Sequence, residues 1–172
     1  MRLLQLVILL MLTVLGHSVS AADLIITRAY VDDPAGRMTL DEVKNQPSLP
    51  FQGVLSRGFT PSATWLKLTV SGLSDVQPGD KLVVRIRPTY LDDIEIHDPL
   101  DNSGRTRQSG DHYDWHDAEF KSLNHGFVIP ASAQPRDIWL RLKTTSSSFI
   151  HVDVLTRTMP SKPTVFRKCS MV

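Results

Sequence analysis

Residues 51–70 read FQGVLSRGFTPSATWLKLTV and decide the fold expected for this chain. Their first half is an irregular approach in which glycine and proline interrupt any regular pattern. From Thr64 the side chains alternate in character, which is typical of a half-buried β-strand. Two sets therefore project to opposite faces: Leu66, Leu68 and Val70 on one, and Trp65, Lys67 and Thr69 on the other. We expect the aliphatic set to enter the core, and the indole N–H of Trp65 to find a hydrogen-bond partner on the other face.

The strand pattern recurs on both sides of this stretch. Alternating or β-branched runs, separated by turn residues, predict strands at 24–31, 63–71, 81–87, 94–97, from about 105, 127–129, 138–143 and 149–155. Thr39 and Glu42 fit a capping box, which predicts one short helix with Leu40 and Val43 facing the body. Pro47 should end this helix by about Gln46. The sequence thus predicts an all-β sandwich of about eight strands with one short helix near the N-terminus.

Composition limits the class of protein. The chain has 172 residues, 41% of them hydrophobic and 22% charged, which suits one globular domain with its own core. The formal net charge of +1 provides no basic field for nucleic acid. Cys169 is the only cysteine, so an intramolecular disulfide is excluded.

The N-terminal segment has the features of a secretory signal peptide. Arg2 precedes an apolar run over residues 3–15, and residues 19–21 offer small side chains for cleavage after Ala21. A retained membrane anchor is the alternative, although the run is shorter than the roughly 20 residues of a membrane span. We expect residues 1–21 to be removed, 22–158 to form an exported domain and 159–172 to be an irregular tail. The mature chain should contain no membrane span.

A series of short motifs in a fixed order carries a family resemblance. The motifs are YVDDPAGRMTLDEV at 30–43, FQ at 51–52, GFTPSATWLKL at 58–68, LDDIEI at 91–96, FVIP at 127–130 and WLRL at 139–142. Over most of residues 24–155 the chain resembles the periplasmic sensor domain, second extracellular type, of bacterial seven-transmembrane receptors with diverse intracellular signalling modules. The resemblance implies a jelly-roll-like β-sandwich, a sensory role and a small-molecule ligand such as a carbohydrate. It supplies no catalytic residue.

The segment DHYDWHD at 111–117 is the strongest candidate for a binding site. If it is extended, Asp111, Tyr113, Trp115 and Asp117 share one face. Aromatic rings beside carboxylates suit a sugar, because its apolar ring face stacks while its hydroxyl groups need polar partners. The alternative is that Trp115 belongs to the core and Tyr113 packs beside it.

The opposite face of the same segment would carry His112, Asp114 and His116, whose side chains could hold zinc or iron. We expect a solvated edge there, with no metal and no cofactor, because ligand types at this spacing are common by chance. A second polar group could suggest acid–base chemistry or calcium, but we expect it on the solvent face of a hairpin: Asp92, Asp93, Glu95 and Asp98.

These patterns favour a non-enzymatic, extracytoplasmic sensor domain that binds a small molecule and signals through a protein such as a membrane receptor. The sequence contains no serine-elbow, phosphate-loop or zinc-protease motif. Two alternatives stay open: a metal-dependent or carbohydrate-active hydrolase, and a structural module that docks on a protein partner. A stand-alone protein and a truncated receptor are both compatible with the chain.

Overall fold

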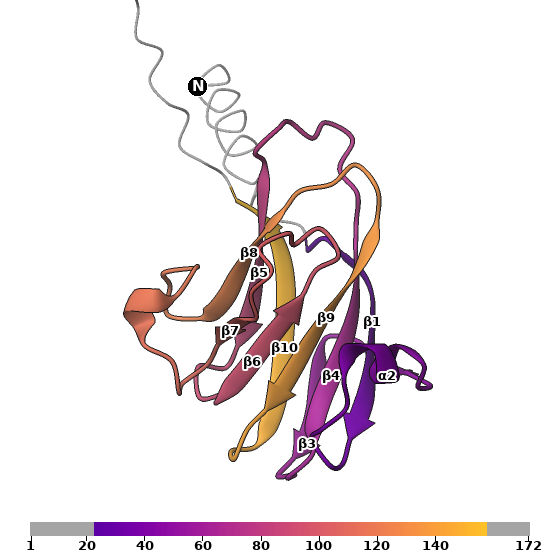
Figure 1. The fold of residues 1–172 in the computed structure, drawn as a ribbon, viewed down its shortest axis with the longest axis vertical. Coiled ribbons are helices and arrows are strands. Elements are labelled where there is room, and N and C mark those ends of the chain that lie inside the picture. Colours follow the sequence, from indigo (N-terminus) through magenta and orange to yellow (C-terminus); the bar gives the residue numbers. More distant parts are fainter. Residues whose placement is uncertain (1–22, 158–172) are drawn as a thin grey trace, which may run out of the picture.

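The computed structural model describes residues 23–157, so the predicted signal peptide (1–21) and tail (159–172) lie outside the described residues. Two antiparallel sheets pack face to face (Figure 1). The six-stranded sheet has the order β2 (Leu49–Pro50), β1 (Ile25–Asp33), β4 (Ala63–Val70), β9 (Arg136–Lys143), β6 (Asp93–His97) and β7 (Arg107–Ser109). The four-stranded sheet has the order β3 (Val54–Gly58), β10 (Ser148–Thr156), β5 (Lys81–Arg87) and β8 (His125–Pro130).

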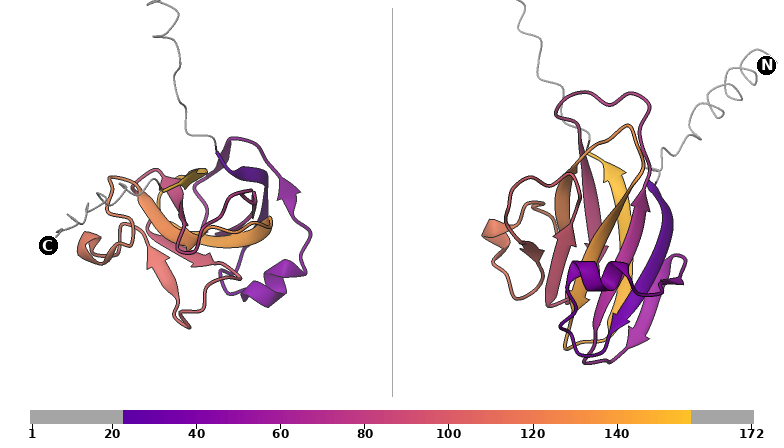
Figure 2. Two further views of the ribbon diagram at one scale, coloured as in Figure 1. Left: turned by 90° about the horizontal axis from the view of Figure 1, so that it is seen from above. Right: turned by 45° about the vertical axis from the view of Figure 1, so that its right-hand side comes forward.

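Strands β3 to β10 are connected as a jelly roll. They alternate between the two sheets along the chain except at the β6–β7 hairpin, which gives the orders β3-β10-β5-β8 and β4-β9-β6-β7. Strands β1 and β2 extend the second of these sheets beyond β4. Seen from above in Figure 2, the two sheets enclose a common interior. The predicted all-β, jelly-roll-like sandwich is therefore confirmed.

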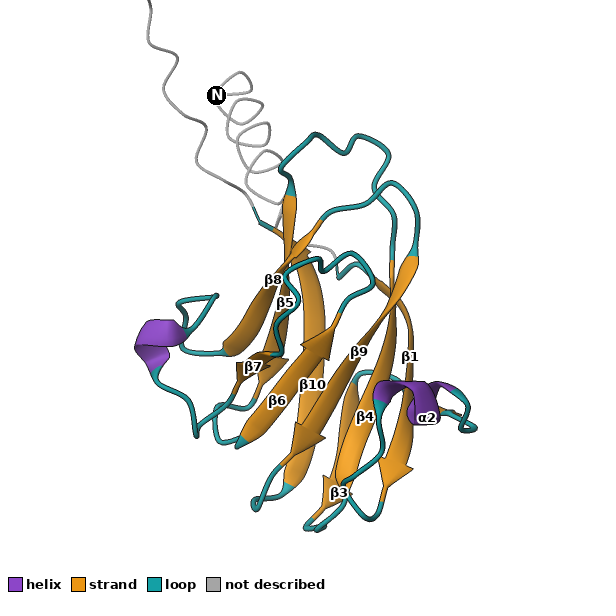
Figure 3. Cartoon of the chain, viewed as in Figure 1, coloured by secondary structure: helices purple, strands orange, loops and turns teal. Residues whose placement is uncertain are grey.

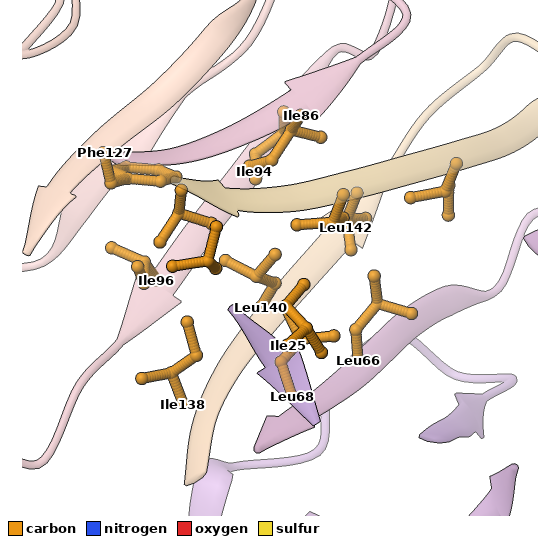
Figure 4. Packing of buried hydrophobic residues seen from close by; sticks show 14 of the residues in the cluster. Ile25, Leu66, Leu68, Ile86, Ile94, Ile96, Phe127, Ile138, Leu140 and Leu142 are labelled. Carbon is orange, nitrogen blue, oxygen red and sulfur yellow. The ribbon is translucent and has the colours of Figure 1, made fainter. Parts of the chain in front are cut away.

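The core is built from the alternating strands that the sequence indicated. Leu66 and Leu68 of β4 are fully buried, and so is Leu140 of β9. Figure 4 shows them in the same cluster as Ile86 and Phe127, which come from the four-stranded sheet. Burying apolar surface at about 25 cal/mol per Å² makes this interior the main source of stability.

Residues 49–63, which include the predicted irregular approach at 51–63, contain more structure than expected. Strand β2 pairs with β1, and β3 pairs with β10, so ten strands form within the described residues where about eight were predicted. Gly53 and Gly58 adopt φ angles of 63° and 64°, a left-handed conformation that costs glycine little. Both strands lie at sheet edges and β2 is two residues long, so neither shows clear alternation.

The predicted helix is present as α2 (Leu40–Lys44), and its capping box forms as expected. The Thr39 hydroxyl accepts from the Glu42 backbone N–H, while the Glu42 carboxylate accepts from the Thr39 backbone N–H at 2.7 Å. The helix ends slightly before the predicted limit, with Asn45 as its C-cap. It lies against the outer face of the six-stranded sheet (Figure 3).

A second apolar cluster lies between α2 and this sheet. It contains Val31, Val43, Trp65 and Trp139, with Met38 and Leu40 packed against it. Trp65 is on the face opposite the main core, as predicted, but it is only 2% exposed. Its indole N–H has no hydrogen-bond partner among the described residues, so the expectation of a partner is wrong. The cluster forms because α2 covers part of a face that would otherwise meet solvent.

The acidic residues of the β6 region are not all on a solvent face, which corrects the prediction. Asp98 is buried and receives a two-pronged ion pair from Arg136, with Nε–Oδ1 and Nη2–Oδ2 both at 2.8 Å. Asp92 is also buried and accepts from the backbone N–H and hydroxyl of Thr145 at 2.6 and 2.8 Å. These hydrogen bonds lower the pKa of Asp92. Both carboxylates therefore have structural partners.

Candidate functional site

The loop between β7 and β8 carries the candidate residues 111–117 and projects from the side of the sandwich (Figure 1). Arg107 anchors its base by donating to both carboxylate oxygens of Glu119 and to the carbonyl oxygen of Val128. Phe120 packs over Gly126, where an added Cβ would lie 2.8 Å from the Phe120 ring. A side chain at position 126 would therefore displace the loop from β8.

The segment 111–117 is not an extended strand. It forms a turn followed by a short 3₁₀ helix, η1 (Trp115–Asp117), whose N-cap Asp114 accepts from the His116 backbone N–H at 2.8 Å. The alternation that would place residues 111, 113, 115 and 117 on one face does not apply here. The correction arises because Asp114 favours a helical turn by capping it, a signal that the polar pattern concealed.

The four candidate residues nevertheless line one groove, of about 450 Å³, together with neighbours from β7 and from residues 118–125. Trp115 is 55% exposed and Tyr113 is 37% exposed, so neither belongs to the core. Asp111 and Asp117 are exposed, and their carboxylates make no hydrogen bond within the part of the chain that the structure describes. The groove thus combines aromatic surface with uncommitted acceptors.

Local contacts hold the two rings in place. The Tyr113 hydroxyl donates to Asp93 Oδ1 at 3.1 Å, and burial together with this carboxylate raises the pKa of Tyr113. The Trp115 indole N–H points to the Ser122 carbonyl oxygen at 3.4 Å. The ammonium group of Lys121 lies 5.3 Å from the Trp115 ring centroid, in cation–π range.

The alternative metal trio is not assembled. His116 Nδ1 lies 2.8 Å from Asp114 Oδ1, whereas His112 faces Asp93 with a separation of 3.6 Å between Nδ1 and Oδ1. Within residues 23–157 no cluster of three or more His, Cys, Asp or Glu side chains is placed to hold a metal ion. Two hydrogen bonds from His116 lower the pKa of Asp114: the one from its backbone N–H has the larger effect, and the one from its side chain the smaller.

Sequence reasoning missed a second group, on the outer face of the six-stranded sheet. The His97 ring stacks on Trp65 with centroids 5.5 Å apart, and Arg141 reaches Glu95 (Nη1–Oε1, 3.3 Å) and the Gly36 carbonyl oxygen (Nη2–O, 3.0 Å). Burial lowers the pKa of His97. The negative charge of Glu95 raises this pKa, while the positive charges of Lys44 and Arg141 lower it.

A hollow of about 530 Å³ adjoins this group, between α2 and the loop after β6. Its walls include His97, Trp139 and Lys67. Each strand's alternation indicated an outward set, but only the register between strands brings these residues together: Trp139 stands opposite both Lys67 and His97. The pattern of a single strand does not contain the register between strands, so this group could not be found from the sequence pattern.

The fold is a jelly-roll domain with polar and aromatic hollows on the outside of a closed core. The family model described as 7TMR-DISM extracellular 2 matches residues 27–156, and the chain belongs to this family of extracellular sensor domains. The resemblance carried by the motifs is therefore confirmed. No curated protein is significantly similar in sequence. No helix among residues 23–157 is long and apolar enough to cross a membrane.

Proposed function

We propose that residues 22–158 act in the periplasm as a non-catalytic sensor domain that binds a small carbohydrate in the groove between β7 and β8. The signal peptide at 1–21 would direct export, and ligand binding would be passed on through contact with a membrane receptor or another signalling protein. Membership of the extracellular sensor family supports the sensory role. The observation that carries the ligand class is the exposed Trp115 ring beside uncommitted carboxylates.

The groove offers the two kinds of contact that a sugar needs. One pyranose face can stack on Trp115 while the Lys121 ammonium group polarises the indole by its cation–π contact. Asp111 and Asp117 can accept hydrogen bonds from the sugar hydroxyl groups. Few groups are involved and the groove is open, so we expect weak binding.

The test is a thermal-shift screen of neutral mono- and disaccharides on the mature chain and on Trp115→Ala. We expect at least one sugar to raise the melting temperature of the native chain, and no sugar to raise that of Trp115→Ala. The variant itself should melt close to the native chain, because an exposed ring contributes little to the core. Phe59→Ala is the matched control, since Phe59 is 82% exposed and lies outside the groove.

Four outcomes would contradict the proposal. Equal binding by Trp115→Ala would remove Trp115 from the site. A loss of roughly 3–5 kcal/mol in stability on the same substitution would mean that Trp115 acts as core. Glycoside turnover that chelator abolishes would favour a metal-dependent hydrolase, and partner capture without any sugar binding would favour a structural docking module.

A further inference from the structure

The outer face of the four-stranded sheet carries a charge cluster that the groove does not use. The β5–β10 register places Arg85 opposite Asp153 and Arg87 opposite His151. Arg85 donates to Asp153 Oδ2 through Nε and Nη2 at 3.2 and 2.7 Å, and Arg87 Nη2 donates to the same oxygen at 2.9 Å. Two guanidinium groups therefore share one carboxylate, which leaves the cluster with an excess positive charge.

The neighbouring histidine has a defined tautomer. Arg87 Nη2 lies 2.8 Å from His151 Nδ1. A guanidinium group can only donate, so Nδ1 must accept and the ring proton must be on Nε2. Asp153 Oδ1 lies 3.4 Å from the same Nδ1, but a nitrogen that accepts from Arg87 cannot also donate to this carboxylate. His151 thus presents an N–H donor, and its Nε2 has no partner within residues 23–157.

These donors border a shallow hollow of about 300 Å³ whose other walls are apolar. It is lined by Val54 of β3, Arg87 and Pro88 at the end of β5, and Phe149 and His151 of β10. Phe149 is 48% exposed and Val54 is 38% exposed. Of the two guanidinium groups, that of Arg87 lines the hollow, whereas Arg85 lies outside its lining.

We propose that this hollow binds a small carboxylate with an apolar body. The polar side chains lining it, Arg87 and His151, both present N–H donors, and the nearby Asp153 is 8% exposed and already engaged. A carboxylate can accept hydrogen bonds from the remaining terminal Arg87 nitrogen, Nη1, and from the His151 Nε2–H, because Arg87 Nη2 is already used by Asp153 and His151. The ring of Phe149 and the side chain of Val54 provide the surface on which the rest of the molecule lies. This anionic site is separate from the carbohydrate groove on the β7–β8 loop.

The test uses isothermal titration of the mature chain with benzoate and, in parallel, with benzyl alcohol, which has the same ring without the charge. We expect benzoate to bind, benzyl alcohol to bind at least about tenfold more weakly, and added salt to weaken benzoate binding. Arg87→Gln should lower the affinity for benzoate about tenfold or more. Arg105→Gln is the matched control, because Arg105 is exposed and lies outside this hollow.

A second pair of variants covers the case in which Arg87→Gln fails to fold. Phe149→Ala removes the apolar wall from an exposed position. Its affinity for benzoate should fall to the affinity of the native chain for acetate, which has the carboxylate without the ring. Phe59→Ala should leave the affinity for benzoate unchanged. The proposal is overturned if the native chain does not bind benzoate, or binds benzyl alcohol equally well. It is also overturned if folded Arg87→Gln or Phe149→Ala binds benzoate with native affinity.

Discussion

Leu68 and Lys67 are neighbours on β4 that face opposite sides of the six-stranded sheet, and their substitution by alanine should have very different effects. Leu68 is fully buried in the main core, so Leu68→Ala should lower the free energy of unfolding by roughly 2–5 kcal/mol. Lys67 is partly exposed and pairs with Asp137 at 3.0 Å, so Lys67→Ala should cost less than about 1 kcal/mol. Urea denaturation of both variants measures the difference, and equal losses would contradict the assigned faces.

His97 should make folding stability depend on pH. Burial lowers its pKa in the folded chain below the ordinary value of 6.5, so below that pH the unfolded chain binds a proton that the folded chain resists. Stability should therefore fall as the pH drops from 7.5 to 5.5. His97→Phe keeps an aromatic ring beside Trp65 and removes the titrating group. The melting temperature of this variant should fall less over the same range, and an identical fall would show that other groups cause the effect.

At the residue scale, the faces of single strands could be predicted and their neighbours could not. Alternation placed Leu66 and Leu68 inward and Trp65 outward, because side-chain direction in a strand has a period of two. It did not show that α2 buries Trp65, because that contact joins residues more than twenty positions apart. Stacking of His97 on Trp65 was equally invisible, since it depends on the register of β9 between their two strands.

At the scale of elements, the capping box of α2 should control how well the helix covers the second apolar cluster. Thr39→Ala removes the hydroxyl that accepts from Glu42, and such losses typically cost about 1 kcal/mol. The amide proton of Val43, which bonds to the Thr39 carbonyl oxygen, should exchange with solvent about fivefold faster. Thr39→Ser keeps the hydroxyl and should exchange at the native rate. Equal exchange in all three proteins would mean that packing alone holds the helix.

Elements were predictable where one interaction dominates. The helix was predicted at the correct place because its cap is local, and the long core strands because their burial is periodic. Strand β3 was missed because it is an edge strand in which only Leu55 is buried. Asp111, Tyr113, Trp115 and Asp117 line one groove, although the extended geometry assumed for their segment was wrong. These residues are exposed because the segment is polar. They lie close together because Asp114 caps a short helical turn.

For the whole molecule, we expect residues 22–158 to contain the complete folding unit. The described sandwich closes at its last strand, where the Arg157 backbone N–H donates to the Lys81 carbonyl oxygen at 3.0 Å. A protein ending at residue 158 should therefore melt within about 2 °C of one that continues to residue 172. Differential scanning calorimetry of the two proteins measures this. A clearly lower melting temperature for the shorter protein would place stabilising contacts in residues 159–172.

The fold class followed from the number and spacing of strands, but the pairing order did not. Ordered motifs along the chain supplied the jelly-roll expectation, and the strand orders of the two sheets agree with it. Hydrophobic periodicity alone allows many ways of pairing the same strands, because each strand reports only which face is buried. The buried pair of Asp98 and Arg136, which joins β6 to β9, illustrates the limit. Asp98 was expected on a solvent face, and no pattern in the sequence indicated that Arg136 would be its partner.

The two ends of the described fold leave it side by side, since the Leu24 backbone N–H donates to the Val154 carbonyl oxygen at 2.8 Å. Entry and exit points this close allow a domain to be spliced into a surface loop of a host protein without forcing the host's chain apart. The sandwich is therefore suited to use as a cassette. Placed within a fluorescent or enzymatic host, it would tie the host's signal to the folded state of the sandwich through that narrow junction.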